Sequence, residues 1–285
     1  MNFDIDLVNE IAANHVWHSN SSEWWGKTNQ ELVRQIEAAF SNDFATINLK
    51  PIGELKIKNT TFGTIQSRHL FGLDELIIFG WYELNSRRYR KVLDLGANIG
   101  VHSIVMSKLG FSVTAYEPDP HHIEIFAKSM ITNDCQNIEL RPRAIGVQNG
   151  VFEFTRVLGN TTGSHLSGSK KGAYGDLEFI KVQVDAIQNV IDEGYDLIKM
   201  DVEGYEAKLI EALSPANFNQ LEIMLEIGNS ENAKTIFHQL PRLKVNAFSQ
   251  KNGWKKVTFL DDLPKSHREG SVFISRSNLM SWTTN

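Results

Sequence analysis

A tight turn with one acid and two glycines is the strongest candidate for a ligand-binding element in this chain. The run Val92-Leu93-Asp94-Leu95-Gly96-Ala97-Asn98-Ile99-Gly100 leads from a short apolar strand into a helix. Gly96 and Gly100 lack a Cβ atom, so the backbone can approach a ligand closely. The helix points its free N–H groups at the same place, which suits a carboxylate or phosphate. Asp94, near the end of the strand, is placed to receive a cationic amine.

A second acid follows the next strand. Glu117 closes a predicted strand over 113–116 and is followed by Pro118 and Asp119. An acid at the tip of the second strand of a βαβ unit accepts hydrogen bonds from the ribose hydroxyls of a nucleoside cofactor. A dinucleotide fingerprint needs G-x-G-x-x-G, but Asn98 stands at its third position. The pattern therefore favours S-adenosylmethionine, whose amino acid end suits the turn; a dinucleotide, or no ligand at all, is the alternative.

A third block, Lys199 to Glu206, places charges at the end of a later strand. Side chains alternate along a strand, so Lys199 and Asp201 point to one face and their apolar neighbours to the other. Open α/β sheets bind ligands at the carboxyl ends of their strands. A cation and two acids, Asp201 and Glu203, are therefore expected beside the cofactor. The alternative is a structural ion pair without a chemical role.

Methyl transfer from a sulfonium to a hydroxyl would require a base. The displacement is in line, so the protein mainly aligns the acceptor and excludes water, but the acceptor proton must be taken up. Asp201 is the first candidate, with Lys199 holding its charge or orienting the acceptor. His165, in a Gly- and Ser-rich loop, is the second, because imidazole titrates near neutrality. Glu226 ends its strand on the same sheet edge and is expected to bind the acceptor or fix Lys199.

Several blocks of sequence together resemble one family. They are Val92 to Gly100, Tyr116-Glu117-Pro118, Asp196 to Glu206, Gly80-Trp81-Tyr82-Glu83 and Leu225-Glu226-Ile227. With these blocks the chain resembles a class I S-adenosylmethionine-dependent methyltransferase, and specifically the FkbM family, over about residues 76–227. The resemblance implies a seven-stranded sheet with the last strand reversed. It also implies methyl transfer to a hydroxyl of a sugar, polyketide or similar metabolite.

The candidate residues fall into two sets. The cofactor-binding set is Glu83, Asp94, Gly96, Ala97, Asn98, Gly100, Glu117, Pro118, Asp119 and Asp201. The catalytic set is Asp201, Lys199, Glu226 and His165. His121 and His122, at the start of a helix, are expected to face solvent.

No metal is expected at this site. Some class I O-methyltransferases hold a divalent ion through several oxygen ligands, and Asp201, Glu226 and Asn229 could supply them. The adjacent Asp-Asn pair that usually follows the later strand is missing, however. Cys135 stands alone, and no His-x-x-x-His pair is present to suggest zinc.

The elements that must position these residues change in character near residue 90. From there strands alternate with helices, which is typical of a mainly parallel sheet covered on both faces. The fold class is therefore α/β, Rossmann-like, with residues 76–285 as the methyltransferase domain. The chain is expected to close with a helix near 231–239 and an antiparallel pair of strands at 255–260 and 271–275.

Two segments lie outside this alternation. Residues 1–75 are interpreted as an extension with a helix over 29–40 and strands near 44–49 and 55–57. Trp17, Trp24 and Trp25 either contribute to a substrate lid or simply pack on the main domain. Further along, β segments at 151–157 and 179–184 bracket a long loop, Gly159 to Asp176. Such a loop is either mobile or functional.

Composition narrows the function classes. The 285 residues include 29 Lys+Arg and 34 Asp+Glu, a net charge of −5, which offers no field to attract nucleic acid. A single cysteine indicates no internal disulfide, and no signal peptide or membrane-spanning run is visible. A cytoplasmic enzyme with a small-molecule or sugar acceptor is expected; its oligomeric state is left open, with a homodimer as the candidate. The alternative is an inactive binding or scaffold protein that keeps the cofactor fold.

Overall fold

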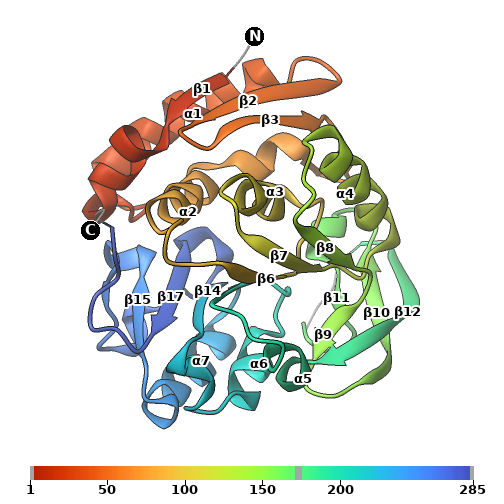
Figure 1. Cartoon of the computed structure of the whole chain (residues 1–285), viewed down its shortest axis with the longest axis vertical. Helices are drawn as coiled ribbons and strands as arrows, with labels where there is room; N and C mark the ends of the chain where they lie inside the picture. The colour runs from red at the N-terminus through yellow and green to blue at the C-terminus, as the bar shows by residue number, and fades with distance from the viewer. Residues whose placement is uncertain (1–2, 171–174, 283–285) are drawn as a thin grey trace.

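An eight-stranded sheet runs through the middle of the molecule (Figure 1). The computed structural model describes residues 3–170 and 175–282. The strands of this sheet are β6 (Lys91–Leu95), β7 (Ser112–Tyr116), β8 (Ile138–Arg141), β13 (Leu197–Met200), β14 (Glu222–Glu226), β15 (Asn246–Ser249), β16 (Lys255–Lys256) and β17 (Ser271–Ser275). Their order in space is β16-β15-β17-β14-β13-β6-β7-β8. The α/β, Rossmann-like class is thereby confirmed.

The direction of the strands places the candidate residues on one edge. Strands β8, β7, β6, β13 and β14 pair in parallel, whereas β17 runs antiparallel to both β14 and β15. The carboxyl ends of the parallel strands therefore meet at the same edge, where the glycine turn and the charged residues lie. The resemblance implied seven strands with the last reversed; the reversed strand is β17, and the two-residue β16 is an additional edge strand.

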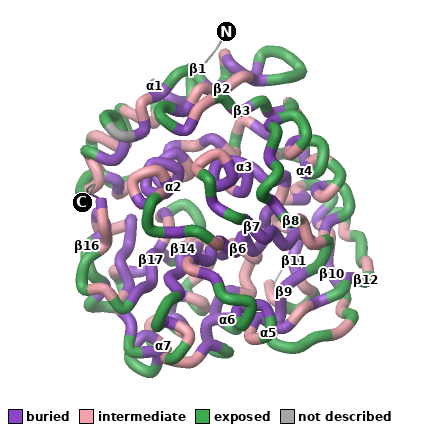
Figure 2. The backbone as a smooth tube through the Cα atoms, in the orientation of Figure 1, coloured by how far each residue is buried: buried purple, intermediate pink, exposed green. Residues whose placement is uncertain are grey.

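Helices cover both faces of the main sheet (Figure 1). The helices α2 (Leu73–Leu84), α3 (Val101–Lys108) and α4 (Pro120–Thr132) lie on one side, and α5 (Ile187–Ile191), α6 (Glu206–Ala212) and α7 (Ser230–Leu243) on the other. Alternate residues of a strand belong to different cores: Leu197 packs with the α2 and α3 side, and Ile198 and Met200 with the α5 to α7 side. This confirms the alternation predicted for the Lys199 strand. Figure 2 shows the central strands as the buried part of the chain.

A second, smaller sheet follows β8. It consists of β9 (Ala144–Gly146), β10 (Gly150–Val157), β11 (His165–Leu166) and β12 (Leu177–Ala186), in the spatial order β11-β10-β12-β9. Strands β10 and β12 are antiparallel neighbours, as expected for two segments that bracket a loop. One face of this sheet packs around Phe154, Val182 and Val184. The sheet holds part of the long loop against the main domain.

The N-terminal part forms a layer over α2 and α3 (Figure 1). Its elements are β1 (Phe3–Asp6), η1 (Leu7–Ile11), η2 (Ala12–Trp17), α1 (Glu23–Ala39), β2 (Phe44–Lys50), β3 (Gly53–Lys58), β4 (Thr61–Phe62), β5 (Ile65–Gln66) and η3 (Ser67–Phe71). Strand β1 pairs in parallel with β2. The layer shares a hydrophobic core with one face of the main sheet, and the boundary expected after residue 75 falls inside α2.

The prediction of a helix over 29–40 was wrong about its first residue. Helix α1 begins at Glu23, because the Ser22 side chain accepts a hydrogen bond from Trp25 N at 3.0 Å and caps the first turn. The spacing between Thr28 and Glu31 suggested a capping box, but both residues lie inside the helix. A strong cap six residues earlier therefore set the boundary.

The closing strands also differ from the prediction. Strand β16 covers only Lys255–Lys256 and pairs with β15, a strand that the sequence analysis did not identify. Strand β17 lies between β14 and β15 rather than beside β16. The short helices in this half and in the long loop are η4 (Thr161–Gly163), η5 (Asn217–Asn219), η6 (Gln250–Asn252), η7 (Leu260–Asp262) and η8 (His267–Glu269). Within the described residues, none of the helices has both the length and the apolar character needed to cross a bilayer.

Candidate active site

The glycine turn after β6 is fixed by the packing of the protein itself. Gly96 and Gly100 have φ of +77° and +83°, in the left-handed region that favours glycine. A Cβ atom on Gly96 would lie 1.8 Å from the carbonyl oxygen of Asp201, and one on Gly100 would lie 2.1 Å from the Phe126 ring. The turn therefore brings the ends of β6 and β13 together. Ala97 follows Gly96, and both backbone N–H groups donate to the carbonyl oxygen of Tyr116 at 3.0 Å.

Glu117 is held by the backbone rather than by a cation. Its Oε2 accepts from Asn98 N and its Oε1 from Asp119 N, both at 2.8 Å. The side chain is buried, and this burial raises the pKa of Glu117 to about 8 even though the two N–H donors favour the ionised form. Pro118 follows it and also lines the cleft described below. The carboxyl group thus joins the glycine turn to the end of β7.

Asp94 and Lys199 form the buried centre of a charged cluster. Ser103 Oγ donates to Asp94 Oδ2 at 2.6 Å, while Asp94 Oδ1 lies 3.8 Å from Lys199 Nζ. Lys199 Nζ is also 3.8 Å from Asp201 Oδ2 and donates to the carbonyl oxygen of Gly96 at 3.4 Å. Burial tends to lower the pKa of Lys199, but Asp94 and Asp201 outweigh it, and the pKa is raised. Lys199 is therefore a permanent ammonium group.

Two further carboxylates face this ammonium group. Burial raises the pKa of Glu226 well above its ordinary value, and Asp201 adds to the effect. Glu75, in the first turn of α2, was missed by the sequence analysis. Burial tends to raise the pKa of Glu75, but His102 outweighs it, so the pKa is lowered. Only the fold brings the start of α2 to the ends of β6 and β13, so no local motif could have identified Glu75.

His102 connects Glu75 to the interior. Its Nε2 lies 2.7 Å from Glu75 Oε2, and the hydroxyl of Tyr82 lies 3.1 Å from its Nδ1. Tyr82 belongs to the upstream G-x-Y-E element, so this element does reach the site through its tyrosine. Its acid does not, because Glu83 lies at the opposite end of α2 from Glu75, and Asp6 in the N-terminal layer contributes to the raised pKa of Glu83 after burial. The structure thus places Glu83 apart from the other candidates.

A cleft of about 590 Å³, partly open to solvent, lies over the ends of β6, β7 and β13. Its lining joins both candidate sets to the long loop and the second sheet: Gly96, Asn98, Tyr116, Glu117, Pro118, His122, Arg143, Ala144, Ile145, Phe154, Thr161, Thr162, Ser164, His165, Leu166, Asp201, Val202, Glu203 and Tyr205. We call residues 161–170 the cap. Residues 171–174 of the predicted loop lie outside the described residues.

The expectation that His122 faces solvent was wrong. His121 is exposed, but His122 is 2% exposed and lines the cleft. Its Nε2 lies 2.9 Å from Thr161 Oγ1 in the cap, and its Nδ1 lies 3.8 Å from Glu117 Oε1. Successive residues of a helix point about 100° apart, so His122 can face the packed side of α4 while His121 faces solvent. Burial lowers the pKa of His122 to about 4, which leaves the imidazole neutral.

His165 belongs to the cap and is buried. It sits in β11 opposite Thr155 of β10, and its Nδ1 lies 3.0 Å from the carbonyl oxygen of Gly163. Burial lowers the pKa of His165 below its ordinary value. A neutral imidazole that donates from Nδ1 to Gly163 leaves Nε2 as a proton acceptor. His165 is therefore not a surface residue.

The loop after β13 carries two acids with different roles. Glu203 has φ of +54° and forms an ion pair with Lys170 of the cap. Burial and the charge of Asp201 raise the pKa of Glu203 to about 7. Glu206, at the start of α6, accepts from the backbone N–H groups of Val202 and Gly204 at 2.9 and 3.1 Å. Glu206 thus stabilises the loop that carries Glu203.

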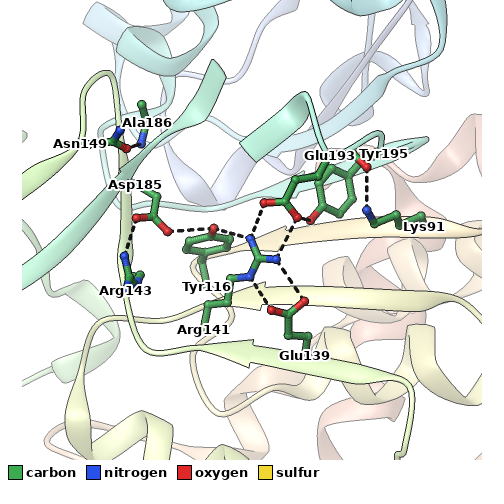
Figure 3. Close-up of polar contacts among 10 residues, drawn as sticks. All are labelled: Lys91, Tyr116, Glu139, Arg141, Arg143, Asn149, Asp185, Ala186, Glu193 and Tyr195. Carbon is green, nitrogen blue, oxygen red and sulfur yellow. Dashed lines mark hydrogen bonds and ion pairs between the residues drawn. The ribbon is translucent and has the colours of Figure 1, made fainter. Parts of the chain in front are cut away.

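An ion-pair network anchors the second sheet beside the cleft (Figure 3). Arg141 Nη1 and Nη2 donate to the two carboxylate oxygens of Glu193 at 2.8 and 2.9 Å, and Nη1 also donates to the hydroxyl of Tyr116. That hydroxyl donates to Asp185 Oδ2 at 3.1 Å, while Arg143 donates to Asp185 Oδ1 at 2.8 Å. The ends of β7, β8 and β12 are therefore tied together at the cleft wall.

A substrate lid from the N-terminal layer is not what the structure contains. The residues described before position 76 contribute nothing to the lining of the cleft. Trp25 donates from Nε1 to Asp74 Oδ1 at 3.2 Å, and Trp24 packs against His18. The cap therefore covers the site instead. In the two described stretches of the chain, no group of three or more His, Cys, Asp or Glu residues could hold a metal ion.

This fold and site define a Rossmann-like protein with a cleft at the carboxyl edge of its sheet. Residues 94–259, more than half of the chain, match the family model described as "Methyltransferase FkbM domain". The chain therefore belongs to the FkbM methyltransferase family. No curated protein matches it in sequence.

Solved structures similar to this chain share little sequence with it. One is an S-adenosylmethionine-dependent methyltransferase from Agrobacterium tumefaciens, with 13% identity, 83% of this chain and 71% of that chain covered, and a TM-score of 0.44. Another is the methyltransferase FkbM from Methylobacillus flagellatus KT, with 11% identity, 89% and 61% covered, and a TM-score of 0.39.

Proposed function

We propose that this protein transfers a methyl group from S-adenosylmethionine to a hydroxyl group of a small metabolite or sugar. The observation that carries the proposal is Glu117, a buried carboxyl at the tip of β7 that lines the cleft beside the glycine turn. An acid in this position accepts hydrogen bonds from a ribose. Family membership favours methyl transfer over the dinucleotide-dependent oxidoreductase considered from the sequence.

The amino acid end of the cofactor fits the glycine turn. Among the residues that the structure describes, Asp94 Oδ1 and Asn98 Oδ1 are buried acceptors without a hydrogen-bond donor. Buried polar atoms normally have a partner, so two such oxygens on one turn suit an ammonium group that donates to them. We therefore assign Asp94, Gly96, Ala97, Asn98, Gly100, Glu117, Pro118 and Asp119 to the proposed cofactor site. Glu83 is left out because of its position.

The charged cluster would serve the acceptor. When bound, the cofactor supplies a methyl group already activated on a sulfonium. Asp201, which lines the cleft, takes the acceptor proton, and Lys199 holds the charge of Asp201 from 3.8 Å. Glu226, whose raised pKa favours its protonated form, donates a hydrogen bond to the acceptor. His165 is the second candidate base through Nε2. The cap excludes water from the reaction.

Calorimetry with S-adenosylhomocysteine tests the cofactor site. The wild-type protein should bind it, and Glu117→Ala should weaken binding at least about 100-fold, because a desolvated pair of hydrogen bonds to a charged group is lost. Glu124→Ala is the matched control, since Glu124 is an exposed acid whose described hydrogen-bond partner is Lys128. No heat with the wild-type protein would instead support the scaffold alternative.

Turnover of hydroxylated acceptors tests the base. On a panel of glycosides and polyketides, Asp201→Asn should lower kcat at least about 100-fold while the Kd for S-adenosylhomocysteine stays within about threefold. The formation of S-adenosylhomocysteine measures the rate. His165→Asn should have the smaller effect. An equal loss of binding and rate in the Asp201 variant would assign Asp201 to the cofactor and remove it as the base.

A further inference from the structure

His122 occupies the point where the cofactor side of the cleft meets the cap. Its helix α4 begins just after Glu117, and its imidazole lies between that carboxyl and the cap hydroxyl of Thr161. Phe62, from the β4 and β5 hairpin, packs edge-on against the other side of the ring with centroids 5.4 Å apart. The ring is therefore enclosed on three sides by groups from different parts of the chain.

The contacts of His122 form a continuous chain across the site. Asn98 N donates to Glu117 Oε2, Glu117 Oε1 lies 3.8 Å from His122 Nδ1, and His122 Nε2 lies 2.9 Å from Thr161 Oγ1. A separation of 3.8 Å is too long for a hydrogen bond, so the middle link is not closed in this state. Links of this kind often shorten only when ligands bind.

The chemistry of the three groups fits one arrangement of protons. Glu117 in its ionised form accepts only, so Nδ1 of a neutral His122 would carry the proton and point it toward Glu117. Nε2 then accepts from the Thr161 hydroxyl. Ribose hydroxyls that donate to Glu117 favour its ionised form and so favour this arrangement. The low pKa of His122 agrees with a neutral ring.

Other parts of the chain also hold the cap. Thr64 N donates to the carbonyl oxygen of Gly159, just before the cap, at 2.8 Å, and Ser167 N donates to Glu153 O at 3.0 Å, while Lys170 pairs with Glu203. These contacts join the cap region to the β4 and β5 hairpin, the second sheet and the loop after β13, none of which carries Glu117. Among the described residues, His122 is in contact with both Glu117 and Thr161 of the cap.

We propose that His122 is a positioning residue that transmits cofactor binding at Glu117 to Thr161, so that the acceptor side of the cleft becomes ordered once the cofactor is bound. The proposal rests on the proposed function, because it needs a nucleoside at Glu117. It makes binding of cofactor and acceptor mutually favourable, with a coupling of the size found between linked sites, about 5- to 100-fold.

Hydrogen exchange of the cap tests the coupling directly. Saturating S-adenosylhomocysteine should slow amide exchange in the cap, residues 161–170, at least about fivefold in the wild-type protein. The protection should fall below about twofold in His122→Ala and in Thr161→Val, although calorimetry still detects binding. His121→Ala is the matched control, because His121 is the exposed neighbour on the same helix turn, and it should behave as wild type.

Steady-state kinetics gives the second readout. His122→Ala should raise the KM for the acceptor about tenfold with kcat within about threefold, whereas His122→Gln, which can keep a bond to Thr161, should recover most of the loss. Full protection and an unchanged KM in both His122→Ala and Thr161→Val would overturn the inference while leaving the proposed function intact. If His122→Ala does not fold, Thr161→Val decides. Failure of the wild-type protein to bind S-adenosylhomocysteine would overturn both proposals.

Discussion

The two sides of the site are built in different ways. On the glycine-turn side (Gly96 to Gly100 with Glu117), main-chain N–H groups hold the buried carboxyl group of Glu117, at 2.8 Å from Asn98 and Asp119. On the charged side, the ammonium group of Lys199 lies 3.8 Å from Asp94 and from Asp201, and Glu226 and Glu75 also face it. The first side depends on main-chain groups at two successive strand ends, and the second on side chains from β6, β14, α2 and the end of β13.

Because of this difference, we expect the two sides to respond differently to substitution. The position of the Glu117 carboxyl group depends on the backbone conformation of the glycine turn. Substitutions that alter the turn should therefore affect the whole site. A cluster of side-chain charges depends on the balance of charge in a buried region, and removal of one member leaves the others uncompensated. Substitutions that separate geometry from charge should therefore affect the two sides differently.

The largest effect is expected where both sides meet. Gly96→Ala would place a Cβ atom 1.8 Å from the carbonyl oxygen of Asp201 at φ +77°, so the ends of β6 and β13 must separate. We expect a loss of at least about 3 kcal/mol in the free energy of unfolding, measured by urea denaturation. Gly110→Ala is the control, because it has φ +87° but no atom within 4 Å and should cost only about 1 kcal/mol. Equal losses would mean that the close approach is unimportant.

A comparably large effect is expected from the loss of the central cation. Lys199→Met leaves Asp94, a fully buried carboxylate, without its ammonium partner, and should cost about 3 kcal/mol by the same measurement. Lys170→Met is the matched control, since its pair with Glu203 is about a third exposed and should contribute less than about 1 kcal/mol.

A second change separates charge from packing on this side. Asp94→Asn in the Lys199→Met background should restore more than half of the lost stability, because the uncompensated charge is removed. A double variant no more stable than Lys199→Met would show that the lysine acts through its packing instead.

A smaller effect, on the glycine-turn side, is the pH dependence that Glu117 contributes. The pKa of Glu117 is raised from 4.5 to about 8, so the native protein keeps a proton that the unfolded chain has lost between these values. The free energy of unfolding should therefore decrease as pH rises through this window. Ribose donors favour the ionised form, so the affinity for S-adenosylhomocysteine should increase up to about tenfold per pH unit below pH 8.

Calorimetry at several pH values measures this change in affinity. Repeating it in buffers of different ionisation enthalpy measures the number of protons released when S-adenosylhomocysteine binds. Glu117→Gln removes the titrating group and should flatten the dependence that is specific to Glu117. The titration of the ligand's own amino group remains in the variant and serves as the reference. If the wild-type profile matches that of the variant, Glu117 does not exchange a proton on binding.

The two sides of the site also differ in how well the sequence predicts them. The positions of the turn residues and of Glu117 could be predicted from the sequence because they follow directly from the ends of β6 and β7. Glu75, His102 and the burial of His122 could not, because each is brought to the site by a helix whose placement depends on long-range packing. Glu83 shows the reverse case, since a local motif match placed it in the predicted site, whereas it lies at the end of α2 away from Glu75 and near Asp6.

The sequence by itself determined the strand ends at which chemistry can occur. A glycine turn, an acid after the next strand and the alternation of Lys199 and Asp201 are properties of neighbouring residues, and they persist in any packing of the sheet. Only the tertiary structure decided that the start of α2, His122 and the cap lie over the ends of those strands. Residues far apart in the chain come into contact because the apolar faces of their helices and strands pack together. The polar residues that this packing brings together show no regular spacing in the sequence that would predict the contact.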